Sequence, residues 1–440
     1  MLIKTYKDRS FDESYSVIDH PCGLRIMFCQ KPFRTFTASL RVRFGEMCTA
    51  YRLKGQKRVY RIPRGTAHFL EHKMFEDEDG QDILTEFFKF GADANAYTSW
   101  DQTTYCFTGT SHFKENLSIL LSMVKKTHFT DESVEKEKGI IGEELCSYLD
   151  DPVNSMYVAA KGNLYSKLAY RYDLGGSVAT IRHIDKDILT RIHRTFYRPD
   201  NMVLSVCGNP DQVDIGTVYR AVTEQFGDAK REDPLPEPVY PDEPDSIVRA
   251  QSTLTRAVAG KGFCLSFKGP ARKDRTDLEL YRQGRVLSIV NELLFSGSSR
   301  LKEELQDRGL LLGDLTSSVV VSRNLSCIQI SGWSERPEQT VSFILSYIEK
   351  YKKTGFSKPD VERAVKVALS ESLLAFDSVD AVAEMMGQLA FYKKDCYSLI
   401  RTYRKVSADD CRTALKRYFR TDFMTYVRLL PLRNAGRITT

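Results

Sequence analysis

Two motifs in the first half of the chain recur in the second half, and this repetition limits the possible fold more than any other feature. The segment 129–135, F-T-D-E-S-V-E, matches 356–362, F-S-K-P-D-V-E, at an offset of 227 positions. The segment 197–202, Y-R-P-D-N-M, matches 419–424, F-R-T-D-F-M, at an offset of 222 positions. Each member of the first pair opens a helical pattern, and each member of the second leads into an apolar strand. Near-equal offsets in one order indicate duplication, so we expect two related domains.

A proline-rich acidic segment separates the two halves. Residues 228–245 contain five prolines among acidic side chains. Because proline lacks an amide hydrogen and has a fixed φ, such a stretch does not continue a helix or a central strand and is typical of an extended linker. We therefore predict a zinc-binding catalytic domain over residues 1–227, a linker over 228–249 and a homologous domain without a metal site over 250–440.

The expected fold class is α+β. Patterns over 24–30, 37–44, 93–98 and 103–109 predict strands, whereas those over 113–126 and 133–149 predict helices. Asp131 is the expected cap of the second helix. Since the strands are segregated from the helices, each domain should hold a largely antiparallel sheet covered by helices, and we expect the two domains to enclose a chamber.

Composition excludes several classes of protein. Of the 440 residues 42% are hydrophobic and 28% are charged, which is typical of a folded protein. No run of about 18 uncharged apolar residues predicts a membrane span, and the opening residues lack the apolar core of a secretory signal. The ten cysteines form no C-x-x-C pair and fit reduced thiols in a cytosol, so we predict a cytoplasmic location. The net charge is only +6 and the basic run 54–58 is interpreted as a solvated loop, so no nucleic-acid partner is expected.

One short segment carries the side chains with the clearest chemistry, His68-x-x-Glu71-His72. In a helix, residues four apart lie one turn apart, so His68 and His72 can face one metal ion with Glu71 beside them. Imidazole nitrogens suit Zn²⁺, and a neighbouring carboxylate can take a proton from a zinc-activated water during hydrolysis. This inverted order, H-x-x-E-H, is a zinc peptidase signature. The simpler interpretation, two solvated histidines, requires a chance pairing among only seven histidines.

The third ligand is not determined by spacing. All seven histidines lie at or before His193, so only the first half can build a histidine site. A catalytic zinc normally has three protein ligands and one open position. Candidates for the third are the glutamates between positions 135 and 144, and on the residues alone any of them would more often be solvated on a helix face.

These motifs resemble the inverzincin metallopeptidases, the family of pitrilysin, insulysin and the mitochondrial processing peptidase. In particular, they resemble its small bacterial two-domain, YmfH-like members. The resemblance covers essentially the whole chain and is strongest from Gly65 to Asp151. It rests on H-F-L-E-H-K-M-F at 68–75, G-A-D-A-N-A-Y-T at 91–98 with Thr104-Tyr105, and E-K-E-K-G-I-I-G-E-E at 135–144.

The resemblance implies a role for each matched residue. It assigns one Zn²⁺ per chain to His68, His72 and Glu144, and it makes Glu71 the general base. Glu137 matches a second glutamate of the family and precedes Glu144 by seven residues, which is two helical turns. Both can therefore face the metal-binding helix, with Glu137 supporting a metal ligand from the second shell.

The substrate-binding residues also follow from the resemblance. Asn95, Ala96, Tyr97 and Thr98 match an edge strand to which an extended peptide adds through main-chain hydrogen bonds. Without the resemblance, an ordinary buried strand is the simpler interpretation of this segment.

The second half departs from the family pattern. Active relatives carry an arginine and a tyrosine that hold the substrate carbonyl. Arg308 is a partial match for substrate binding, but Leu312 stands near the tyrosine position. Either another tyrosine or a partner subunit must then complete the site.

Together these features predict a zinc metalloendopeptidase that hydrolyses peptides or unfolded segments, with leader or precursor peptides as candidate substrates. The resemblance further implies a homodimer, or a heterodimer with a related and catalytically degenerate subunit. The alternative is a noncatalytic scaffold or binding subunit of a heterodimeric peptidase. Such subunits typically lose the ligand set, which this chain retains.

Overall fold

Two large sheets, each at the centre of its own compact unit, organise the computed structural model and confirm the α+β class. The structure describes residues 2–126, 128–271, 274–322, 324–392 and 394–432. Unit 1 comprises Met1–Leu145, Asp173–Tyr240 and Ser372–Ser398, and unit 2 comprises Cys146–Tyr172, Pro241–Glu371 and Leu399–Thr440. Each unit therefore takes segments from both halves of the sequence.

The sheet of unit 1 has seven strands in the order β1-β2-β3-β9-β4-β8-β7 among the described residues. Neighbours are antiparallel except for β3 and β9. Every residue of β4 and β9 is buried, as expected for central strands covered on both faces, whereas β7 lies at one edge. The strands are β1 (Lys4–Asp8), β2 (Glu13–Asp19), β3 (Arg25–Gln30), β4 (Phe36–Val42), β7 (Ala92–Thr98), β8 (Thr103–Gly109) and β9 (Met202–Gly208).

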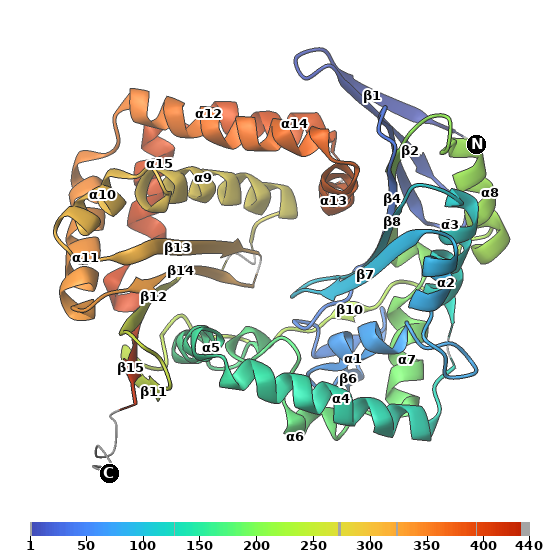
Figure 1. Ribbon diagram of the computed structural model, residues 1–440, viewed down its shortest axis with the longest axis horizontal. Coiled ribbons are helices and arrows are strands. Elements are labelled where there is room, and N and C mark those ends of the chain that lie inside the picture. The colour runs from blue at the N-terminus through green and yellow to red at the C-terminus, as the bar shows by residue number, and fades with distance from the viewer. Residues whose placement is uncertain (1, 127, 272–273, 323, 393, 433–440) are drawn as a thin grey trace, which may run out of the picture. The chain divides into compact units, whose positions relative to one another are not determined.

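Helices cover both faces of this sheet (Figure 1). On one face α3 packs against β4 and β8 through an apolar stripe that recurs at helical spacing. On the other face α13 packs against β3, β4 and β9. The helices of unit 1 are α1 (Thr66–Lys73), α2 (Leu84–Lys89), α3 (Phe113–Lys125), most of α4 (Asp131–Asp150), α6 (Val178–Ile181), α7 (Lys186–Phe196), α8 (Ile215–Phe226) and α13 (Val379–Ala390).

The two faces of the unit 1 sheet differ in chemistry. Toward α3, strands β4 and β9 present apolar side chains such as Leu40 and Leu204, which belong to the main core. Toward α13, the same strands present Ser39, Arg41 and Ser205, which are all buried. The helix α13 therefore covers a face that combines these buried polar side chains with apolar ones such as Met27 and Val203.

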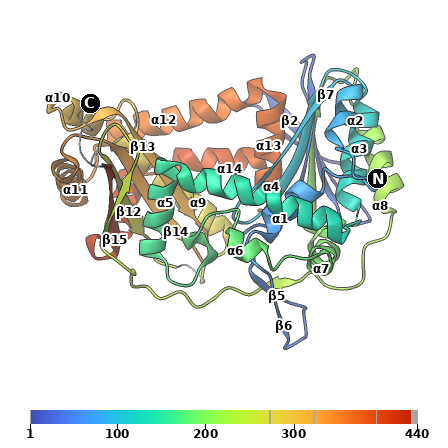
Figure 2. The same cartoon turned by 60° about the horizontal axis from the view of Figure 1, so that its bottom comes forward.

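A small sheet fixes part of the predicted linker within unit 1. It contains β5 (Ala50–Arg52) and β6 (Val59–Arg61), which are labelled in Figure 2, and β10 (Glu237–Pro238), in the order β10-β5-β6. The rest of the linker has neither helix nor strand, and Asp233 accepts a 2.9 Å hydrogen bond from the buried Arg198. The linker thus adds a short strand to unit 1 before the chain enters unit 2.

The sheet of unit 2 has the order β11-β15-β12-β14-β13 among the described residues, with only β11 and β15 parallel. This order and these directions repeat those of β3-β9-β4-β8-β7 in unit 1. The strands are β11 (Gln251–Arg256), β12 (Gly262–Lys268), β13 (Leu312–Val321), β14 (Ser326–Trp333) and β15 (Met424–Pro431).

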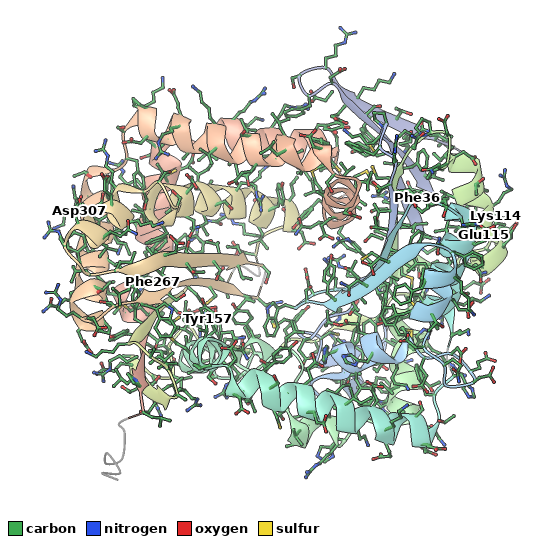
Figure 3. The ribbon with its side chains drawn as sticks, in the orientation of Figure 1. Phe36, Lys114, Glu115, Tyr157, Phe267 and Asp307 are labelled. Carbon is green, nitrogen blue, oxygen red and sulfur yellow. The ribbon has the colours of Figure 1, made fainter. Side chains whose placement is uncertain are left out.

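Helices also cover the sheet of unit 2. On one face α5 packs against β12 and β15, and the Tyr157 hydroxyl of α5 lies 2.7 Å from Ser331 Oγ of β14 (Figure 3). The other helices are α9 (Asp277–Phe295), α10 (Arg300–Asp307), α11 (Pro337–Thr354), most of α12 (Lys358–Leu374) and α15 (Ala408–Tyr418), and α5 spans Pro152–Leu164. Helix α14 (Cys396–Ile400) begins in unit 1 and ends in unit 2. Short 3₁₀ turns occupy Ala169–Arg171, Pro199–Asn201, Ala375–Asp377, Arg401–Lys405 and Thr421–Phe423.

The two halves of the sequence exchange one helix each. Helix α5 follows α4 in the first half but packs on the sheet of unit 2, and α13 follows α12 in the second half but packs on the sheet of unit 1. The units are therefore interleaved along the chain. The division into homologous domains at residues 227 and 249 stays a prediction.

Local expectations are mostly met. The structure places strands and helices at all six segments predicted for the first half. The predicted cap Asp131 is wrong, because the amide of Ser133 donates to the side-chain oxygen of Thr130 at 3.1 Å and Asp131 is already helical. All ten cysteines are free. None of the described helices has the length and apolar character needed to cross a bilayer.

Candidate metal centre and active site

The helix that carries the H-x-x-E-H motif, α1, starts at a tightly packed glycine. Gly65 has φ +86°, and a Cβ atom there would lie 2.4 Å from the carbonyl oxygen of Gly175, so a larger residue would collide with the backbone. The Gly65 amide donates to the Glu46 carboxylate at 2.8 Å. Glu46 is buried, and burial raises its pKa to about 8. This contact satisfies an amide at the start of α1 that has no partner within the helix.

His68, His72 and Glu144 form a cluster suited to a metal ion. His68 Nε2 lies 3.7 Å and His72 Nε2 lies 3.4 Å from Glu144 Oε2, and one ligand atom from each residue lies within 4.8 Å of the others. Tetrahedral zinc with bonds of about 2.0–2.2 Å separates its ligand atoms by about 3.3 Å. The donor types and their spacing therefore fit Zn²⁺.

Glu137 supports the cluster. Its Oε1 atom lies 2.9 Å from Nδ1 of His72, which is the distance of a hydrogen bond from the imidazole N–H. A donor at Nδ1 leaves the Nε2 lone pair of His72 directed toward Glu144, the side on which a metal would bind. Burial lowers the pKa of His72, but the hydrogen bond to Glu137 and the nearby carboxylates outweigh it, so this pKa is raised. Burial lowers the pKa of His68, which favours the neutral imidazole that a metal requires.

Glu71 lies on the same helix and contacts the edge strand. Its Oε2 atom accepts a 2.5 Å hydrogen bond from the Thr98 hydroxyl at the end of β7. Burial raises the pKa of Glu71, although the Thr98 hydroxyl opposes this shift. The structure thus brings together the predicted base and one of the four residues predicted to bind substrate.

The predicted peptide-binding strand has one open edge. Strand β7 pairs with β8 alone among the described strands, and Asn95 and Tyr97 are exposed. An open depression of about 400 Å³ lies beside it, lined by α1, α2, α4, the loop before α2, and residues 94–96 of β7. Glu71 and His72 also line it, so a side chain held there would lie next to the candidate metal centre.

Arg308 and Leu312 belong to unit 2. Arg308 follows α10 and places its guanidinium 4.7 Å from the ring centroid of Phe343. Leu312 opens β13 and is 45% exposed. The role of Arg308 in substrate binding stays a prediction.

Sequence reasoning did not identify Glu46 as a contact of the motif helix. It also did not foresee that Thr98 would bind Glu71. The local sequence pattern predicts neither contact, because Glu46 and Gly65 are 19 positions apart and Glu71 and Thr98 are 27 positions apart.

Two family models match the chain in succession. The model described as "Insulinase (Peptidase family M16)" matches residues 62–177, which include all the residues of the cluster. The model described as "Peptidase M16 inactive domain" matches residues 183–367.

Similar proteins and structures span much or all of the chain. A protein of Bacillus subtilis (strain 168) described as the uncharacterized zinc protease YmfH is 28% identical over 410 residues, covering 91% of this chain and 93% of its own. The beta subunit of a mitochondrial-processing peptidase of Caenorhabditis elegans is 28% identical over 177 residues, covering 38% of this chain and 37% of its own. The crystal structure of an M16-like protein of Alicyclobacillus acidocaldarius superposes with a TM-score of 0.88 at 26% identity, covering 98% of both chains.

Proposed function

Because this chain belongs to the M16 peptidase family, as its motifs predicted, we propose that it is a zinc metalloendopeptidase acting on peptides or unfolded protein segments. The observation that carries the proposal is the cluster of His68, His72 and Glu144 beside Glu71. The cluster has the nitrogen and oxygen donors that catalytic zinc takes, and Glu71 lies next to it.

Each residue of the cluster has a distinct task in this proposal. His68 and His72 would hold zinc through Nε2, and Glu144 would hold it through a carboxylate oxygen. When bound, the ion supplies Lewis-acid polarisation of water and of the scissile carbonyl. Glu71 takes a proton from the attacking water and passes it to the leaving amine, while Thr98 holds the other carboxylate oxygen in place.

The open edge of β7 would bind the substrate. An extended peptide can add to this edge through main-chain hydrogen bonds, which favours unfolded segments and accepts many sequences. Asn95, Ala96, Tyr97 and Thr98 provide that edge, and the adjoining depression would receive one substrate side chain. Leader and precursor peptides in the cytoplasm are the substrates we propose to test first.

A test separates the base from the ligands. Glu71→Gln should keep about one zinc per chain and lose roughly 100- to 10,000-fold in turnover, the usual contribution of a general base. His68→Ala and His72→Ala should lose the metal. Glu86→Gln serves as the matched control, because Glu86 lies on the neighbouring helix α2 with a side chain that is 46% exposed, and it should behave as wild type. Turnover by Glu71→Gln equal to that of wild type would refute the assignment.

A partner subunit is part of the proposal. Leu312 stands near the position where active relatives carry a tyrosine, and leucine cannot donate to the substrate carbonyl, so another tyrosine or a partner subunit must supply that donor. One of its relatives is named as the beta subunit of a processing peptidase. We therefore propose a dimer, either of two copies or with a related chain that provides the missing donor. The second candidate function, a noncatalytic subunit, rests on the same departure and predicts that any cleavage seen with a partner is unchanged by His68→Ala, His72→Ala or Glu71→Gln in this chain.

A further inference from the structure

An ion pair between a buried arginine and a partly exposed glutamate links α13 to β4 and contacts the edge strand β7. Arg41 of β4 is fully buried and pairs with Glu384 of α13. The hydroxyl of Tyr97 on β7 donates to Glu384 and accepts a 3.1 Å hydrogen bond from Nη2 of Arg41. Burial and the contact with Glu384 raise the pKa of Tyr97, so the phenol stays protonated and can donate.

The next residue along β7 is held from the opposite face. Successive side chains of a strand point to opposite faces, so Thr98 points away from Tyr97. Its hydroxyl reaches Glu71 of α1 at 2.5 Å. The end of β7 is therefore fixed on one face by α13 and on the other by α1. We refer to Arg41, Glu384, Tyr97 and Thr98 as the edge-strand clamp.

An edge strand needs such support more than a central strand does. Among the described strands, β7 is hydrogen-bonded to another strand on one side only. The backbone hydrogen bonds of such an edge strand open more easily than those of a strand paired on both sides. The clamp supplies side-chain contacts at the end of β7 that adjoins the proposed base.

We propose that Tyr97 and Glu384 are positioning residues for the peptidase reaction: by holding the end of β7 they keep the Thr98 hydroxyl against Glu71. This inference rests on the proposed function, in which Glu71 is the base. It assigns a task in the reaction to α13, a helix from the half of the sequence that lacks histidine.

Other contacts between α13 and the sheet allow the role of the Tyr97 hydroxyl to be tested by itself. Thr108 of β8 donates to Asp380 of α13 at 2.5 Å. A Cβ atom on Gly387 would lie 2.4 Å from Arg41 Nε, so α13 packs closely against the sheet there. Tyr97→Phe removes the hydroxyl contacts but leaves the Arg41–Glu384 pair and these attachments intact. Removing Glu384 itself would leave the buried Arg41 without its anion and could unfold the unit, so it is not the primary variant.

Kinetics of the zinc-loaded full chain provide the first readout. Thr98→Val should lower kcat about tenfold with unchanged zinc content, and Thr98→Ser should restore it, because serine keeps the hydroxyl. Tyr97→Phe should lower kcat severalfold and raise KM. If Tyr97 acts through Thr98, the double variant should have the kcat of Thr98→Val alone. Thr108→Val also loses a hydroxyl that holds α13, and as the matched control it should stay within about twofold of wild type.

Amide hydrogen exchange provides a readout that does not depend on activity. In the metal-free chain, Tyr97→Phe should speed exchange severalfold over residues 92–98, and Thr108→Val should not. Unchanged exchange in Tyr97→Phe, or kcat losses that multiply in the double variant, would overturn the inference. Faster exchange together with no zinc-dependent cleavage by wild type, either alone or with a related partner subunit, would support the clamp and refute the proposed function instead.

Discussion

Removing the Glu137 carboxylate should weaken zinc binding without touching a metal ligand. Glu137 lies 2.9 Å from Nδ1 of His72, and both side chains are largely shielded from water. In Glu137→Ala the imidazole loses the partner that fixes its tautomer and orientation. Nε2 then has to be reoriented toward Glu144 when the metal binds.

The magnitude follows from the nature of the contact. Loss of a carboxylate that supports a metal-binding histidine typically costs about 10- to 100-fold in affinity, or about 1.4 to 2.7 kcal/mol. Glu137→Gln keeps an oxygen that can accept from Nδ1 but loses the charge, so its affinity should lie between those of wild type and Glu137→Ala.

The assay is a competition titration of metal-free protein with zinc and a chromogenic chelator at one neutral pH. Glu143→Ala is the matched control, because Glu143 lies exposed on the same helix. Its affinity should equal that of wild type. The reasoning would be refuted if Glu137→Ala bound zinc within about twofold of wild type, or if Glu143→Ala lost as much affinity.

Three further predictions follow. Glu144→Gln should lose zinc and Glu143→Gln should keep it when metal content is measured after dialysis; the reverse result would identify a different third ligand. Burial raises the pKa of Glu46 from about 4.5 to about 8, so the free energy of unfolding should fall as pH rises through this range, by up to about 5 kcal/mol. Urea unfolding at pH 5, 7 and 9 should show this loss in wild type and little of it in Glu46→Gln, and an equal loss in both would contradict the assignment. Finally, cleavage of a model peptide should rise and saturate as a related partner subunit is added, whereas full activity of a monomer would show that this chain supplies its own second donor.

The spacing of the motif predicted that His68 and His72 lie side by side, and the structure places their ring centroids 4.6 Å apart. His68 and His72 lie four residues apart on one helix, and helical geometry places them on one face. The choice of Glu144 depended on the family resemblance, because several glutamates on α4 satisfy a helical spacing. The structure brings Glu144 to both histidines, while its role as a ligand stays a prediction.

Sequence patterns did not predict the contacts between distant segments of the chain. Arg41 and Glu384 are 343 positions apart, and no local periodicity indicates that α13 leaves its own half. From the sequence alone, an arginine in a strand is predicted to be exposed, because charged residues are mostly solvated. Its burial is recognised only when the structure shows its partner. The duplicated motifs indicated two related halves, but they do not reveal the exchange of α5 and α13.

The exchanged helix α13 has a consequence for synthesis on the ribosome. Strand β9 is complete at Gly208, but the helix that covers it begins at Val379, so about 170 more residues must be made first. At translation rates of about 5–20 residues per second, the face of the sheet that α13 covers stays uncovered for roughly ten to thirty seconds. That face carries Ser39, Arg41 and Ser205, which favour water, beside the apolar Met27 and Val203, which do not. The apolar part of this face therefore stays uncovered until α13 is made, and the buried serines and arginine limit how large that apolar area is.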